Sequence, residues 1–132
     1  SLVFTPRPVV QQMVDILEAE NPGIFSDPTK TFADLFSTAG LFLMELVRRL
    51  YNGLADQMPD QDERLRHILT EQLFEMSHNE ILHRITIEAV SGGIAERKRW
   101  IEASGHFMVG NLARMSPEDR QRTVADMLTE GT

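Results

Sequence analysis

The spacing of apolar residues switches repeatedly between a helical period and short apolar runs, and this pattern predicts an α/β fold. Apolar residues three and four positions apart are typical of helices, whereas short apolar runs between turn formers are typical of strands. We predict, in chain order, a helix over 8–20, a strand beginning at 31, a helix over 41–51, a helix carrying Leu65, Ile68 and Leu69, a strand over 72–77, a helix over 79–90, a helix over 95–103, a strand over 106–111 and a helix from 117 nearly to the end. Because strands separated by helical crossovers pair in parallel, we expect about three parallel strands with flanking helices, which is half of a doubly wound domain.

The same pattern predicts which side of two of these helices is buried. In the first helix the expected buried residues are Val9, Val10, Met13, Ile16 and Leu17. In the helix over 79–90 they are Ile81, Leu82, Ile85 and Ala89.

Composition and charge narrow the possible functions. The 132 residues are 42% hydrophobic, enough for one domain with its own core. The formal net charge of −7 argues against autonomous nucleic-acid binding, because phosphate backbones are bound mainly by Lys and Arg. Zero cysteines exclude disulfides, thiolate metal sites and thiol nucleophiles. The sequence has no apolar run of about 18 residues and no signal-peptide pattern, so we expect a cytoplasmic protein.

The stretch 31–45 is the strongest candidate for a ligand pocket. Asp34 lies in an expected strand, the small-residue turn 37–40 follows it, and a strongly apolar helix begins after Gly40. Such a turn lets a ligand approach the backbone, and the helix N-terminus offers unpaired N–H groups. Strand, turn and helix together predict a nucleotide-sized pocket.

An ordered series of motifs over nearly the whole chain resembles one family, the S-adenosylmethionine-dependent N6-adenine DNA methyltransferases of restriction–modification systems. The segment Phe4-Thr5-Pro6 is similar to the family's N-terminal Phe/Tyr-Thr-Pro motif, and 34–43 resembles its glycine-rich cofactor loop. The segment 72–80 stands in the place of the family's second strand, and Val109-Gly110-Asn111 in that of its third. The resemblance implies that 1–132 is the first half of a Rossmann-like methyltransferase domain, with 1–30 as the N-terminal motif and helix and 31–132 as strand–helix units.

The resemblance also implies roles for individual residues. The cofactor-binding residues that it indicates are Thr5, Pro6, Asp34, Phe36, Ser37, Thr38, Ala39, Gly40, Glu75, Ser77 and Asn111. Thr5, Pro6, Asp34 and the turn 37–40 would face the methionine part of S-adenosyl-L-methionine. Glu75 or Ser77 would lie near its ribose, and Asn111 near its adenine.

The sequence departs from the family pattern in several places. Thr38 and Leu41 stand where glycines are usual, Glu75 occupies another glycine position, and Ser77 replaces the ribose-binding acid. The catalytic Asn/Asp-Pro-Pro-Tyr/Phe motif, which holds the flipped base, is absent, because the chain contains no Pro-Pro pair. We therefore expect no methyl transfer by this segment alone. DNA would be contacted by parts of the protein outside it, and a restriction nuclease or specificity module is a possible partner.

Alternative interpretations follow from the same residues. The departures favour a degenerate methylase-like scaffold that does not bind the cofactor, and a different Rossmann-like enzyme using a nucleotide ranks third. The histidines at 67, 78, 83 and 106 show no i, i+4 pairing, so we predict no metal site. The basic segment 97–100 could contact a phosphate, but a short solvated helix with Trp100 packed on the core is favoured.

Overall fold

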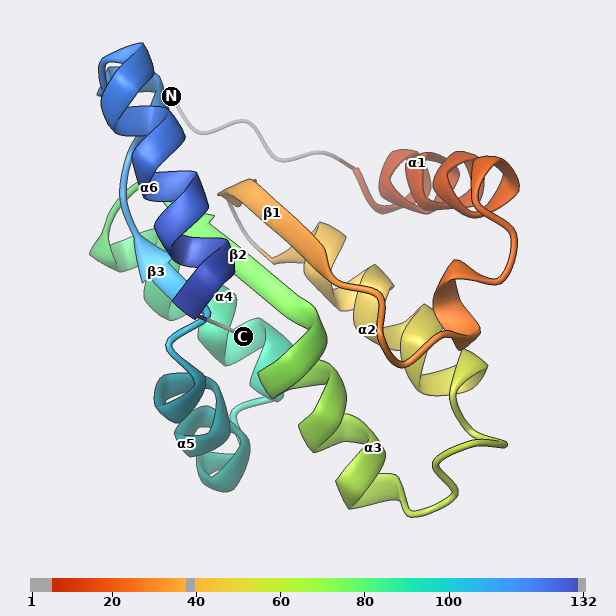
Figure 1. Cartoon of the computed structure of the whole chain (residues 1–132). Helices are drawn as coiled ribbons and strands as arrows, with labels where there is room; N and C mark the ends of the chain where they lie inside the picture. The colour runs from red at the N-terminus through yellow and green to blue at the C-terminus, as the bar shows by residue number, and fades with distance from the viewer. Residues whose placement is uncertain (1–5, 38–39, 131–132) are drawn as a thin grey trace.

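The computed structural model describes residues 6–37 and 40–130, and it has the α/β fold expected from the sequence. Its three strands are β1 (Phe32–Ser37), β2 (Leu73–Ser77) and β3 (Phe107–Val109). They form one parallel sheet in the order β1-β2-β3, with helices on both faces (Figure 1). This is a partial Rossmann-like arrangement, so the predicted fold class and element order are confirmed.

The helices divide into two layers around the sheet. Their bounds are α1 (Arg7–Glu20), α2 (Leu41–Gly53), α3 (Gln61–His67), α4 (Glu80–Ser91), α5 (Ala95–Ser104) and α6 (Pro117–Glu130), with short helical turns η1 (Ile24–Ser26), η2 (Ile68–Gln72) and η3 (Leu112–Arg114). The larger core cluster joins the sheet to α1, α2, α4 and α5, and a smaller cluster joins the other face to α6. In Figure 1, α6 accordingly crosses the sheet on the side opposite α2 and α4.

Strand β2 is buried along its whole length because helices cover both faces of the sheet. Leu73 packs into the larger cluster, and Phe74 and Met76 pack into the smaller one. Side chains alternate along a strand, so Glu75 and Ser77 point to the same side as Leu73. Two polar side chains therefore enter the layer between the sheet and α4.

The predicted buried side of α1 is only partly right. Val10 and Val14 are buried, whereas Val9, Met13 and Ile16 are exposed. Helix α1 packs mainly against α2, and a single neighbouring helix covers a narrower stripe than the wide apolar face of α1.

For α4 the prediction fails at two of its four positions. Leu82 is buried, but Ile81 is 70% exposed and Ile85 is 44% exposed. The inward face instead carries Thr86 and Val90. Ile87 is also buried on this face, so the inward side of α4 is largely apolar but is not the one that the spacing predicted.

Three of the sequence-predicted site residues, Thr5, Thr38 and Ala39, lie outside the described residues. Within residues 6–37 and 40–130, no helix is both long and apolar enough to cross a lipid bilayer.

Candidate functional site

Polar side chains from the carboxyl-terminal parts of β1 and β2 gather beneath α4. In the sheet register Asp34 lies opposite Glu75, and Ser37 lies opposite Ser77. Open α/β sheets bind their ligands at the carboxyl ends of the strands. The structure thus brings four of the sequence-predicted residues to the edge where a ligand is expected.

Glu75 is the most unusual member of this cluster. Its side chain is fully buried, and its Oε2 accepts a hydrogen bond of 2.8 Å from the hydroxyl of Ser77. Burial raises the pKa of the Glu75 carboxyl from its ordinary 4.5 to about 7; the bond from Ser77 opposes this rise and the charge of Asp34 adds to it. The carboxyl can therefore hold or release a proton close to neutral pH.

Asp34 lies next to Glu75 and is half-buried. Its Oδ1 accepts a hydrogen bond of 3.2 Å from the backbone N–H of Phe36. Burial raises the pKa of the Asp34 carboxyl, and that hydrogen bond opposes the rise. Phe36 itself is 55% exposed at the end of β1, so its ring is free to contact a ligand.

Ser37 at the end of β1 and Gly40 at the start of α2 both contact α4. The hydroxyls of Ser37 and Thr86 are 3.3 Å apart and share a hydrogen bond. Gly40 has a φ of +77° at the start of α2, a backbone conformation that favours glycine. A Cβ at Gly40 would lie 3.5 Å from the Cα and Cγ2 of Thr86, so the turn and α4 are in close contact.

Three residues of the site were missed by the sequence analysis. His78, directly after β2, places its ring 6.4 Å from that of Phe36, and His83 and Thr86 of α4 face Glu75 and Ser37. Positions three apart share a helix face, so the spacing of His83 and Thr86 was a usable signal. The apolar spacing of Ile81 and Ile85 pointed to a different face of α4, so this polar signal did not enter the prediction.

Two further predicted residues, Asn111 and Pro6, come from the segment after β3 and from the start of α1. Asn111 is half-exposed after β3, and its Oδ1 accepts a hydrogen bond of 3.1 Å from the N–H of Ala113, which caps η3. Pro6 is exposed at the start of α1, where its carbonyl accepts hydrogen bonds from the N–H groups of Val9 and Val10.

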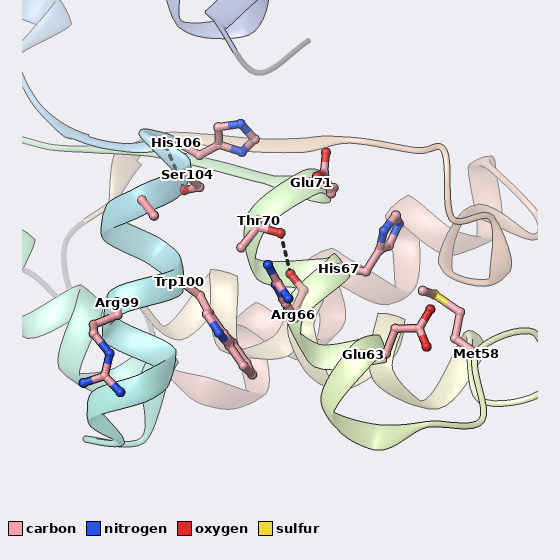
Figure 2. Close-up of a pocket in the computed structure, with 11 residues that line it drawn as sticks. Met58, Glu63, Arg66, His67, Thr70, Glu71, Arg99, Trp100, Ser104 and His106 are labelled. Atoms are coloured by element: carbon pink, nitrogen blue, oxygen red, sulfur yellow. Dashed lines mark hydrogen bonds between the residues drawn. The ribbon is translucent and has the colours of Figure 1, made fainter.

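A groove of about 870 Å³ lies at the opposite end of the sheet, between α5 and the α3–η2 segment. Figure 2 shows Trp100 and Arg66 on its facing walls, with His106 at the start of β3. Trp100 is half-buried and packs against the larger core cluster, which confirms the favoured interpretation of this residue. The groove lies where the strands begin, which is not where such sheets bind a nucleotide.

Metal ligation has no structural support in the part of the chain that is described. Residues 6–37 and 40–130 contain no group of three or more His, Asp or Glu side chains placed to hold a metal ion.

Comparison with known proteins connects the chain to one methylase. It is 28% identical over 116 residues to an uncharacterized adenine-specific methylase of Mycoplasma pneumoniae (strain ATCC 29342 / M129 / Subtype 1), a match that covers 88% of this chain. The similarity supports a methylase relationship. The aligned part is 28% of the relative's length. No family model and no solved structure matches the chain. The alternative of a degenerate scaffold is not favoured by this similarity.

Proposed function

We propose that this chain is the cofactor-binding part of an S-adenosylmethionine-dependent DNA adenine-N6 methyltransferase from a restriction–modification system. The observation that carries the proposal is the strand β1 with Asp34, followed by Gly40 at the start of α2, in a chain that is similar to an adenine-specific methylase. The restriction–modification context rests on the motif resemblance. DNA, and a nuclease or specificity module, would be engaged by parts of the protein outside these residues.

The residues at the carboxyl edge fit a ligand of this kind. Gly40 opens α2 in a left-handed conformation, and the first N–H groups of α2 lack helical acceptors, which suits the carboxylate of an amino acid. The carboxylate of Asp34 suits its ammonium group, and the exposed ring of Phe36 offers an apolar surface. The cofactor supplies the methyl group.

The chain's own contribution would be binding and orientation. The sequence has no Pro-Pro pair and therefore no Asn/Asp-Pro-Pro-Tyr/Phe motif. We propose that the target adenine of the DNA is held by residues outside this segment. The segment alone would then not catalyse methyl transfer.

Calorimetric titration with S-adenosyl-L-methionine tests the proposal. We expect saturable binding by the protein and at least about tenfold weaker binding by Asp34→Ala, a loss of about 1.4 kcal/mol. Asp62→Ala is the matched control, because Asp62 is an exposed acid in the first turn of α3. Its affinity should equal that of the wild type.

Circular dichroism of each variant separates a binding defect from a folding defect. If the folded wild-type protein showed no heat of binding at millimolar cofactor, the proposed function would be wrong. Equal affinities of the wild type and Asp34→Ala would remove Asp34 from the site.

A further inference from the structure

Two buried polar atoms face each other across the contact between β2 and α4. The Oε1 of Glu75 and the Nδ1 of His83 are 3.5 Å apart, and both lie beneath the surface without a hydrogen-bond partner of normal geometry. Buried polar atoms are paired in most proteins, so each unpaired one requires an explanation. A proton placed between these two atoms would satisfy both.

The surroundings of Glu75 make the charge of this pair important. The ionisable groups that face its carboxyl are Asp34 on β1 and His83 on α4. Its neighbour in β3 is Phe107, which carries no charge. The remaining polar neighbours, Ser37 and Ser77, are uncharged. Among the described residues that pack here, only His83 can bring a positive charge.

One proton makes the Glu75–His83 pair electrically neutral. Either the neutral carboxyl donates to the imidazole, or the imidazolium donates to the carboxylate. Removal of that proton leaves a carboxylate next to Asp34 in a place that is closed to water, and an unscreened buried charge is costly. The contact between α4 and the sheet therefore favours the protonated pair.

Movement of α4 would be transmitted to the turn before α2. Thr86 of α4 shares a hydrogen bond with Ser37 and lies against Gly40. Lifting α4 from β2 would admit water to Glu75 and would remove the contacts of Thr86 with Ser37 and Gly40.

We propose that Glu75 and His83 form a proton-dependent latch, which fastens α4 to the sheet when the pair holds a proton and loosens it when the proton is lost. Closing of α4 takes up a proton, and opening releases it to water. The latch belongs to the chain itself and does not depend on the proposed methylase activity.

Hydrogen exchange of the amides of α4, followed by mass spectrometry from pH 6 to pH 8, tests the latch. For the Glu75 carboxyl alone, an ordinary pKa of 4.5 in the open state against about 7 in the closed state makes the opening constant rise with pH, by at most about tenfold over this range. The rise is measured after correction for the intrinsic pH dependence of exchange. In Glu75→Gln, which keeps the shape but cannot ionise, we expect no rise.

Glu88→Gln is the matched control on the same helix. Glu88 is exposed and pairs with Lys98 of α5, so its removal changes a charge of α4 without touching the pair. This variant should keep the rise seen in the wild type. A wild type with a flat profile, or a Glu75→Gln variant with the wild-type profile, would overturn the latch.

A measurement on the wild type alone covers the case in which Glu75→Gln does not fold. The ¹³C chemical shift of the Glu75 carboxyl, followed by NMR, should titrate near neutral pH. The ¹⁵N shifts of the His83 ring, followed in the same samples, show whether the proton lies on the imidazole instead. If neither the Glu75 carboxyl nor the His83 ring changed its protonation between pH 6 and pH 8, the proposal would be wrong.

Discussion

Gly40 gives the sharpest test of the turn, because replacing it with alanine changes the backbone preference and little else. Its φ is +77°, and an added Cβ would be at ordinary contact distance, 3.5 Å, from Thr86. A residue with a Cβ costs roughly 1–2 kcal/mol in this left-handed conformation. Steric overlap adds nothing here, so Gly40→Ala should lose about that amount.

The loss can appear in one of two measurements. If the turn keeps its shape in Gly40→Ala, the free energy of unfolding falls by about 1–2 kcal/mol. If the turn relaxes, less stability is lost, but S-adenosyl-L-methionine must restore the native turn when it binds. Its affinity then falls by the remainder, at most roughly 5- to 30-fold. The two losses should add up to about 1–2 kcal/mol.

Gly105→Ala is the matched control for this variant. Gly105 has a φ of +70° after α5, and a Cβ there would meet nothing within 4 Å. It should lose the same roughly 1–2 kcal/mol of stability with unchanged cofactor affinity. Urea unfolding and calorimetry measure both quantities. A Gly40→Ala protein with wild-type stability and wild-type affinity would refute the assigned role of the turn.

Four further substitutions test other parts of the structure by urea unfolding. Arg64 is buried and donates to the carbonyls of Tyr51 and Met58, both at 2.9 Å, and of Pro59 at 3.3 Å. Arg64→Ala should lower the free energy of unfolding by about 3 kcal/mol, because three carbonyls lose a charged donor. Leu82→Ala should lower the free energy of unfolding by about 2–5 kcal/mol, whereas Ile81→Ser on the exposed side of α4 should change it by no more than about 0.5 kcal/mol. Equal losses would contradict the observed burial of Leu82 and exposure of Ile81. For Glu75, the pKa is higher in the folded state than its ordinary 4.5. Its contribution to stability is therefore full below pH 4.5 and is lost as the pH rises through about 7. The resulting loss of unfolding free energy is at most about 3 kcal/mol. Glu75→Gln should remove this dependence of stability on pH. If stability varied with pH in this variant as it does in the wild type, Glu75 would not be the ionising group.

The order of the elements could be predicted because local signals mark most of them. Asp60 and Asn79 accept hydrogen bonds from backbone N–H groups at the starts of α3 and α4, as capping residues do. The change from helical spacing to short apolar runs located all three strands. These signals depend on neighbouring residues, so a single sequence contains them.

The buried side of each helix could not be predicted in the same way. Hydrophobicity identifies which side chains avoid water, but not which of two apolar sides a neighbouring element will cover. In α4 the inward side is the one with Thr86, which bonds Ser37, 49 residues away in the chain. The same side carries the buried Ile87 and Val90, and Ile85 lies on the exposed side. The spacing of His83 and Thr86 marks a polar face of α4, but nothing near them in the chain identifies Ser37 as the partner.

Asp34 and Glu75 are not independent, and this affects how the binding experiment is interpreted. The negative charge of Asp34 helps to raise the pKa of Glu75. Asp34→Ala therefore removes a possible cofactor contact and also makes it easier for Glu75 to ionise. Near pH 6 the Glu75 carboxyl of the wild type is mostly protonated, so a loss of affinity in Asp34→Ala at that pH reports mainly the missing contact. Asp34→Ala combined with Glu75→Gln separates the two effects, because the double variant cannot ionise at either position. If the cofactor contact of Asp34 is direct, adding Asp34→Ala to Glu75→Gln weakens binding as much as adding it to the wild type, at both pH 6 and pH 8.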